Sequence, residues 1–190
     1  MANIWFTSDL HFGHDKEFIW KARGFENIEE MNKTIIERFN SKVQPEDTVY
    51  ILGDSMLGDA AIGEECLKQL NGNKIIIIGN HDTANRIKIY QKYAEEVVYA
   101  KVIKYKKKNF YLSHYPTITG NLDDSPHTCV INLYGHTHQL NNFFEERPYM
   151  YHVGVDSHNC YPVSIDDIIK DYYAKVDECL KFVKEETNEE

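Results

Sequence analysis

Seven side chains of the kinds that bind metal ions recur along the sequence in short groups. They are four imidazoles, two carboxylates and one amide: Asp9, His11, Asp54, Asn80, His114, His136 and His138. This mixture contains no thiolate and suits first-row divalent ions such as Mn²⁺, Fe²⁺, Co²⁺, Ni²⁺ or Zn²⁺. It is too rich in histidine for Ca²⁺ or Mg²⁺ alone. Seven ligands are too many for one tetrahedral ion, so we expect two divalent ions ~3.5–4 Å apart that share a carboxylate.

Each of these groups follows a short apolar run that is typical of a strand. The runs cover residues 3–6, 48–52, 74–78, 109–113 and 129–134. In open α/β sheets, ligands bind beyond the carboxyl ends of the strands. We therefore expect the topology of the chain to collect the seven side chains along one rim of the fold.

Two features of the local spacing support a shared site. Asp9 and His11 are two residues apart, as are His136 and His138, and residues i and i+2 of an extended chain point to the same side. Each pair can therefore hold one object together. Glycines at 53, 79 and 135 precede Asp54, Asn80 and His136, and we expect them to let the backbone turn sharply where each strand stops.

The elements that must position these residues follow from hydrophobic periodicity. Helices are predicted over residues 28–43, 60–70, 85–93 and, from a capping box at Ser164, about 164–184. Besides the runs above, residues 97–105 are predicted to form a strand paired with 109–113 as a hairpin, and 149–155 a further strand. The predicted class is α/β: two mixed β-sheets packed face to face with flanking helices, in a single domain over residues 1–190 whose acidic tail, 185–190, frays.

Composition excludes several classes of function. Lys and Arg number 21 against 30 Asp and Glu, so the formal charge is −9, which argues against a surface that coats nucleic acid. The four cysteines are scattered without a C-x-x-C pair, which argues against a thiolate zinc site and a disulfide framework. The sequence holds no apolar run long enough for a membrane span and no signal peptide at its start, so we expect a cytoplasmic protein.

The ordered motifs resemble those of the calcineurin-like metallophosphoesterases. They are D-L-H at 9–11, G-D at 53–54, G-N-H-D at 79–82, a lone His114 and G-H-T-H at 135–138. The start of the chain looks most like the small bacterial and phage members, which begin F-T-S-D-x-H-F-G-H. Each motif alone is weak, and the ordered set, which runs from Asp9 to about Asp156, is specific. The resemblance implies a four-layer α/β/β/α sandwich.

The resemblance also implies roles. Asp9, His11 and His138 would hold the first metal ion; Asn80, His114 and His136 would hold the second; Asp54 would bridge them. His81 would donate a proton to the leaving oxygen or stabilise its charge, and Asp82 would orient His81. The predicted activity is hydrolysis of a phosphate ester by in-line attack of a metal-bound hydroxide, with Mn²⁺ foremost among the candidate ions.

This sequence differs from the motifs of two branches of the family, and the differences narrow the class of substrate. The arginine that grips phosphate in the Ser/Thr protein phosphatases is missing after Asp54, and His81 stands where the lipid A pathway pyrophosphatases have an arginine. We therefore favour a phosphodiester, as a small phosphate ester or nucleotide-type substrate. A phosphomonoesterase or protein phosphatase stays open, with Arg86 or Arg147 as the phosphate clamp, and so does a scaffold without activity.

Several residues keep two interpretations. His14 could reach substrate or cap a helix, and Asp156 could support a metal ligand, although a turn aspartate is the simpler reading. His127, His152 and His158 are expected at the surface or in the core. The run Lys106–Lys108 could attract a nucleic acid backbone, but a solvated hairpin tip is favoured. The oligomeric state is left open.

Overall fold

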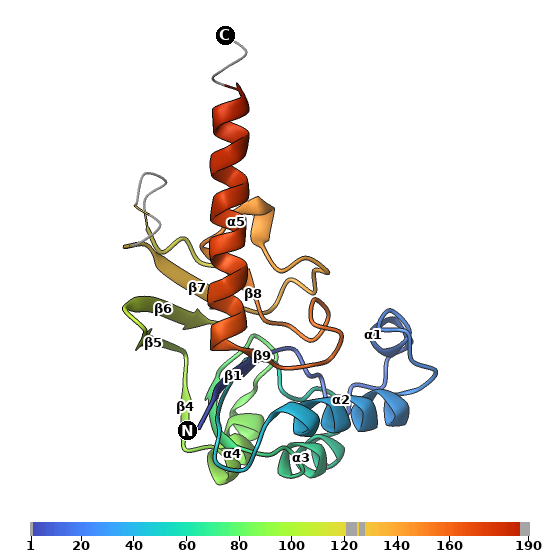
Figure 1. The fold of residues 1–190 in the computed structure, drawn as a ribbon. Coiled ribbons are helices and arrows are strands. Elements are labelled where there is room, and N and C mark those ends of the chain that lie inside the picture. The colour runs from blue at the N-terminus through green and yellow to red at the C-terminus, as the bar shows by residue number, and fades with distance from the viewer. Residues whose placement is uncertain (1, 121–124, 126–127, 187–190) are drawn as a thin grey trace.

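The structure, a computed structural model, describes residues 2–120, 125 and 128–186. It contains two β-sheets with helices around them (Figure 1). The strands are β1 (Ile4–Thr7), β2 (Thr48–Leu52), β3 (Asn73–Ile77), β4 (Glu96–Val98), β5 (Ala100–Tyr105), β6 (Lys108–Ser113), β7 (Val130–Tyr134), β8 (Met150–His152) and β9 (Val163–Ser164). The helices are α1 (Glu17–Trp20), α2 (Ile28–Lys42), α3 (Ala60–Lys68), α4 (Ala84–Tyr93) and α5 (Ile165–Glu186), with a 3₁₀ turn at Phe144–Glu146.

Both sheets are mixed, as predicted. The first has the order β4-β3-β2-β1-β9, in which only β9 runs antiparallel to its neighbour. The second has the order β5-β6-β7-β8, in which β5 and β6 form the antiparallel hairpin and the other pairs are parallel. Because β1, β2 and β3 are parallel neighbours, as are β6, β7 and β8, their carboxyl ends meet at one edge of each sheet.

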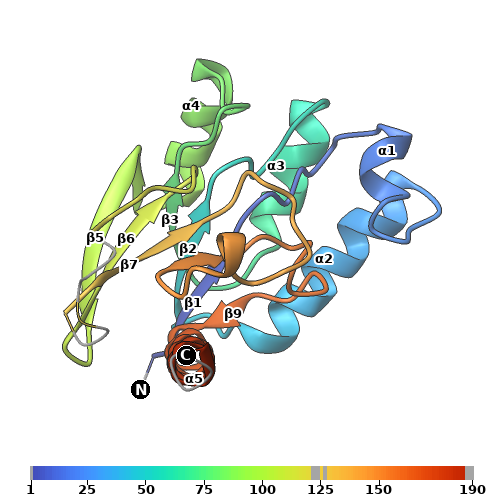
Figure 2. The same cartoon turned by 90° about the horizontal axis from the view of Figure 1, so that it is seen from above.

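The two cores explain how the layers hold together. Helices α2, α3 and α4 cover one face of the first sheet (Figure 2). There Met31, Ile35 and Phe39 of α2 pack with Val49 and Ile51 of β2. The second core lies between the sheets and is built from alternate strand residues: Phe6, Tyr50, Leu52, Ile75 and Ile77 from the first sheet, and Phe110, Leu112, Ile131 and Leu133 from the second. The face-to-face packing of two sheets with flanking helices is thus confirmed.

The predicted strand over 97–105 is divided in the structure. Its first part is β4, which extends the first sheet beside β3, and its second part is β5, which belongs to the second sheet. Tyr99 lies between them and is 77% exposed. No glycine, proline or other turn residue stands near Tyr99 in this segment, so the sequence could not reveal that the chain changes sheets there.

Helix α5 begins at the predicted capping box, because Ser164 Oγ accepts from the backbone N–H of Asp167 at 3.1 Å. Its buried side chains, Ile168, Tyr172 and Val176 among them, join the core between the sheets. The helix therefore flanks the sandwich beside β1 and β9 (Figure 2), as the fold that the resemblance implied requires. It ends at Glu186, beyond the predicted 184; residues 187–190 of the expected tail lie outside the described residues.

The lysines at 106–108 do not form a fully solvated tip. Lys106 and Lys107 make the turn with φ of 44° and 68°, and Lys106 Nζ lies 2.8 Å from Asp166 Oδ1 of α5. Lys108 is buried, with its ammonium 4.7 Å from the ring centroid of Tyr172. The hairpin is docked on α5, which the sequence run alone did not indicate. Among the described residues, no helix is both long and apolar enough to cross a bilayer.

Candidate metal centre

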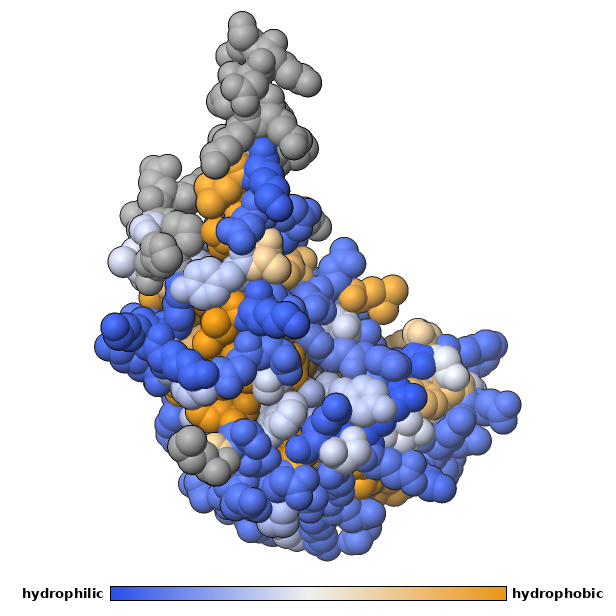
Figure 3. All heavy atoms as spheres, viewed as in Figure 1, coloured by the Kyte–Doolittle hydropathy of each residue, from blue (hydrophilic) through white to orange (hydrophobic). Residues whose placement is uncertain are grey.

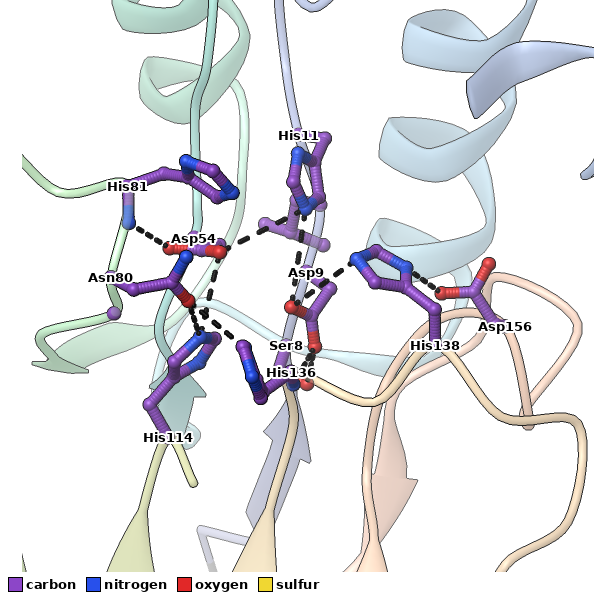
Figure 4. A network of polar contacts seen from close by, with 12 residues as sticks. Ser8, Asp9, His11, Asp54, Asn80, His81, His114, His136, His138 and Asp156 are labelled. Atoms are coloured by element: carbon purple, nitrogen blue, oxygen red, sulfur yellow. Dashed lines mark hydrogen bonds and ion pairs between the residues drawn. The ribbon is translucent and has the colours of Figure 1, made fainter. Parts of the chain in front are cut away.

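The seven predicted ligands come together where the rims of the two sheets meet (Figure 4). Those from the first sheet follow β1, β2 and β3, and those from the second follow β6 and β7: Asp9, His11, Asp54 and Asn80, then His114, His136 and His138. The strand-end placement expected from the sequence is therefore what the structure has, and the site spans both sheets.

One group of ligand atoms gathers around Asp9. His11 Nε2 and His138 Nε2 each lie 3.9 Å from Asp9 Oδ1. One ligand atom from each of these three residues lies within 4.8 Å of the others. That spacing leaves room for a divalent ion between them, because metal–ligand distances of ~2.0–2.2 Å put ligand atoms ~3–4 Å apart.

A second group gathers around Asn80. Its Oδ1 lies 2.8 Å from His114 Nε2 and 2.9 Å from His136 Nδ1. The Nδ1–H of His114 donates to the backbone carbonyl of Leu52 at 2.8 Å, which leaves Nε2 to face the site. The carboxyl terminus of β2 therefore fixes the ring of a residue from the other sheet.

Two carboxylates lie between the groups. Asp54 Oδ2 is 3.4 Å from His114 Nε2 and 4.0 Å from His11 Nε2, and its Oδ1 accepts from the backbone N–H of His81 at 3.0 Å. Asp9 is also central, because it forms a second compact set with Asp54 and His114. The structure thus offers two carboxylates in the bridging region, where the resemblance named only Asp54.

Unpaired buried atoms show that these residues fit a cation. Asp9 is fully buried, and its Oδ1 has no hydrogen-bond partner; neither has His11 Nε2. Buried polar atoms normally have a hydrogen-bond partner. The lack of one at both atoms indicates that a cation or another electron-pair acceptor belongs between them. Burial, together with the positive charges of Arg23 and His138, lowers the pKa of His11 to about 2, so its imidazole is neutral and keeps a lone pair. Two adjacent electron-pair donors without a partner are what a divalent ion would satisfy.

The ligands sit on strained backbone. Five of them have positive φ: 56° at Asp9, 52° at His11, 51° at Asp54, 67° at His136 and 49° at His138. Side chains other than glycine rarely adopt this region, at a cost of roughly 1–3 kcal/mol each. The expectation that strand alternation aims the paired ligands was therefore wrong. The strands have already ended, and left-handed turns turn these side chains inward.

The three glycines serve the site in two ways. Gly53 has a φ of 91° and makes the expected turn. Gly79 and Gly135 are needed for space, since a Cβ on Gly79 would lie 2.2 Å from Asp54 Oδ1 and one on Gly135 would lie 2.4 Å from Asp9 Oδ2. Gly53 also lacks room for a side chain, since a Cβ there would lie 2.3 Å from His114 Nδ1. The sequence located these positions correctly, but only tertiary contacts show that all three provide close approach.

His81 and Asp82, which are neighbours in the sequence, have different surroundings in the structure. The ring of His81 is exposed at the edge of the site, 5.9 Å from the ring of His11. Asp82 turns away from that ring: its Oδ2 accepts from the N–H groups of Gly79 at 2.7 Å and Asp54 at 3.1 Å, and Tyr90 donates to its Oδ1 at 2.5 Å. Asp82 thus braces the loops after β2 and β3, instead of orienting the His81 imidazole as the resemblance implied.

Asp156 supports a metal ligand, which the sequence analysis had placed second to a turn role, and its partner Arg23 was not predicted. His138 Nδ1–H donates to Asp156 Oδ2 at 2.9 Å, which turns Nε2 of His138 toward Asp9. Arg23 donates to both oxygens of Asp156, at 2.9 and 3.1 Å, and to the backbone carbonyl of Asp9 at 2.8 Å. Although burial favours the neutral acid, the hydrogen bond from His138 and the charge of Arg23 hold the pKa of Asp156 below its ordinary value.

The remaining candidates have defined places. His14 Nδ1 lies 3.3 Å from His11 Nδ1. His14 is not a helix cap, because Lys16 occupies the N-cap position of α1 and no side chain makes a capping hydrogen bond there. His152 is buried and His158 is half-buried, and His158 Nε2 lies 2.9 Å from the backbone carbonyl of His152. His127 lies outside the described residues. Of the two candidate phosphate clamps, Arg86 donates to the carbonyl of His81 at 2.6 Å, and Arg147 pairs with Glu145 at 3.2 Å.

Replacing Asp156 with asparagine should lower the free energy of unfolding of the metal-free protein by about 3 kcal/mol. The Arg23 side chain is only 4% exposed, so the variant leaves a buried guanidinium without its countercharge. Urea denaturation followed by circular dichroism measures the effect. Asp166→Asn is the matched control, because it breaks an exposed pair with Lys106 and should change stability much less. Equal losses in the two variants would show that the Asp156 pair is no more than a surface contact.

Comparisons with known proteins cover nearly the whole fold. A model of the calcineurin-like phosphoesterase superfamily domain matches residues 3–155. The uncharacterized protein MJ1445 of Methanocaldococcus jannaschii is 35% identical over 181 residues, which cover 90% of this chain and 91% of that protein. The gene 66 protein of Mycobacterium phage L5 is 31% identical over 186 residues, covering 83% and 88%. The solved structure of AQ665 from Aquifex aeolicus, a protein of unknown function, matches with a TM-score of 0.67 and 26% identity, covering 90% of this chain and 99% of that one. All seven candidate ligands lie within the residues that the family model matches.

Proposed function

The chain belongs to the calcineurin-like phosphoesterase superfamily, and on that premise we propose that it is a dinuclear metal-dependent phosphoesterase with a preference for phosphodiesters. The observation that carries the proposal is the pair of ligand groups, one around Asp9 and one around Asn80, with the carboxylate of Asp54 between them. Mn²⁺ is the first candidate ion, and Fe, Zn, Ni and Co suit the same ligands.

Each residue then has a stated task. Asp9, His11 and His138 would hold one ion, Asn80, His114 and His136 the other, and Asp54 would contact both. Bound ions would neutralise charge on the phosphoryl oxygens and lower the pKa of the attacking water. Asp156 and Arg23 hold His138 in the tautomer that offers Nε2. His81 stands exposed at the edge of the site, where it would give a proton to the leaving oxygen.

The charges around the site favour a diester. A phosphomonoester dianion carries an extra negative charge, which protein phosphatases meet with arginine. Among the described residues that line the cavity beside the site, Arg23 alone is a permanent cation, and Asp156 neutralises it. A diester has one negative charge and two ester groups, so it depends on the ions without a further clamp.

A complete ligand set argues for activity. A scaffold derived from an enzyme of this kind would have no reason to keep five strained ligand positions, with the unpaired buried atoms of Asp9 and His11 among them. We therefore propose hydrolysis in preference to a non-catalytic role. Among hydrolases, we propose a phosphodiesterase in preference to a phosphomonoesterase or protein phosphatase.

The test is reconstitution of metal-stripped protein with Mn²⁺, followed by assays on bis(p-nitrophenyl) phosphate, p-nitrophenyl phosphate, cyclic nucleotides and short nucleic acids. We expect no hydrolysis before metal is added, two ions per chain by elemental analysis afterwards, and a higher kcat/KM on the diester than on the monoester. Full activity in the stripped protein would overturn the metal mechanism, and a preference for the monoester would overturn the substrate class.

A further inference from the structure

A cavity of about 670 Å³ opens beside the candidate metal centre, on the side of His11 and His138. One wall is made of histidine rings, and His14 and His81 belong to it as well. The rest of the wall is mainly apolar and comes from segments far apart in the sequence: Phe18 in α1, Leu57 after β2, and Leu140 in the loop after β7. This volume is within the range of pockets that hold small organic ligands, ~300–1,000 Å³.

Two large apolar side chains of this wall are left in contact with water. Phe18 is 69% exposed and Leu140 is 79% exposed, although both line the same cavity. The surface around α1 carries apolar atoms among hydrophilic ones (Figure 3). Single exposed apolar residues are common, but two that converge on one cavity next to a reactive centre mark a binding surface.

The rings in the cavity form a continuous aromatic series. The ring of His14 stacks on that of His11, with centroids 5.4 Å apart and planes at 26°. The ring of Phe18 meets His14 edge-on, with centroids 5.7 Å apart and planes at 87°. A further planar ring can join such a series by stacking or by edge contact, each worth more than the burial of its area alone.

The charges that line the cavity indicate that it binds an uncharged ligand group. Arg23 and Asp156 both line it, but they pair with each other through two hydrogen bonds. The described lining contains no other arginine, lysine or carboxylate besides this pair, so a charged ligand group would find no opposite charge there. An uncharged ring would lose little hydration and would cover Phe18 and Leu140.

The position of His81 sets which part of the substrate enters. His81 lines this cavity, and in the proposed reaction it protonates the leaving oxygen. The leaving alcohol must therefore lie on the cavity side of the phosphorus atom. We propose that the cavity binds an uncharged planar ring carried by the leaving alcohol, either an aryl group or a nucleobase, so that Phe18 and Leu140 determine specificity. This inference rests on the proposed phosphodiesterase activity.

The kinetic test compares diesters that share a methyl group and differ in the other alcohol. Methyl phenyl phosphate carries a ring, and methyl hexafluoroisopropyl phosphate has a leaving alcohol of similar acidity without one. In Phe18→Ala and Leu140→Ala, KM for the phenyl ester should rise about tenfold with kcat within about twofold, and KM for the other ester should stay unchanged. Tyr99→Ala and Val102→Ala are matched controls, since those side chains are 77% and 67% exposed on the β4–β5 segment, and they should match the wild type.

A second arm separates the two sources of the ring. The methyl ester of thymidine 5′-phosphate is compared with its counterpart lacking the base, and the released alcohol is identified by chromatography. Release of thymidine with a Phe18-dependent KM identifies a nucleobase site; Phe18 dependence on the phenyl ester alone identifies an aryl site. Equal KM changes on ring-bearing and ringless esters, or release of methanol in place of thymidine and phenol, would overturn the inference.

Binding without turnover distinguishes this inference from the proposed function. Phenol and thymidine are titrated into metal-free protein, and the chemical shifts of the cavity residues are followed by NMR. We expect saturable shifts that weaken about tenfold in Phe18→Ala, whereas ribose produces none. If no ester is hydrolysed but the rings bind, the proposed function fails and the cavity assignment stands. If esters are hydrolysed and neither ring binds, the cavity assignment fails.

Discussion

Asparagine in place of Asp54 is expected to remove at least one metal ion per chain and to reduce hydrolysis about 10³-fold or more. The Oδ2 atom of Asp54 lies between the two histidine groups, 4.0 Å from His11 Nε2 and 3.4 Å from His114 Nε2. An amide carries no charge to hold two cations together. The fold should survive, because the amide oxygen still accepts from the backbone N–H of His81 in place of Oδ1. Metal content and turnover are measured on the same reconstituted sample.

Asp47→Asn is the matched control for this variant. Asp47 is equally buried and accepts from the backbone N–H groups of Asn3 and Gln44 and from Trp5 Nε1, at the amino end of β1. Its replacement should lower stability but leave metal content and turnover unchanged. Asp9→Asn tests the second central carboxylate, since Asp9 belongs to both compact ligand sets. If Asp54→Asn binds two ions with normal activity while Asp9→Asn loses them, Asp9 is the bridge.

The second large effect concerns His81, whose variant His81→Ala should keep both ions and lose kcat according to the leaving group. A general acid contributes ~10²–10⁴-fold where the leaving oxygen is basic, and little where it is already stable. We therefore expect a loss of about 10²-fold or more on alkyl esters and a much smaller loss on p-nitrophenyl esters. His81 is exposed and belongs to neither compact set of ligand atoms among the described residues, which is the reason to expect full metal content.

The two outcomes that contradict this assignment differ. Near-equal losses of kcat on alkyl and p-nitrophenyl esters would remove the acid role and leave only positioning or charge stabilisation. Loss of an ion from His81→Ala would make His81 a ligand. Because His81 donates its backbone N–H to Asp54 Oδ1, and alanine keeps that N–H, the substitution tests the ring alone.

The candidate site was largely predictable because its residues follow one topological regularity. Every predicted ligand comes after the carboxyl end of a strand, and such ends must meet when the strands run parallel. Asp156 obeys the same regularity after β8, and applying it to the predicted strand over 149–155 would have favoured the metal-supporting role over the turn aspartate. Arg23 lies between α1 and α2, where no pattern marks it, so only the folded chain reveals its contact with Asp156.

The fold was predictable where apolar residues recur with the period of a strand or a helix. It was less predictable where an element's position depends on contacts with residues far away in the sequence. Alternation and helical spacing located nearly every strand and helix. They could not show that residues 97–105 change sheets at Tyr99, because no turn residue marks that point. They also could not show that Lys108 is buried against Tyr172, because a lysine run in a predicted turn gives no information on what packs over it.

The placement of the ligands on both sheets has a mechanical consequence. The group around Asp9 joins the loops after β1 and β7, and the group around Asn80 joins the loops after β3, β6 and β7. Each ion would therefore cross-link loops of the two sheets. The sheets could then separate only if the ions were released. By linkage, an ion at a thousand times its Kd would add about 4 kcal/mol to the free energy needed to separate the sheets. Substitutions deep between the sheets, such as at Leu112 or Leu133, would accordingly weaken metal affinity without touching a ligand.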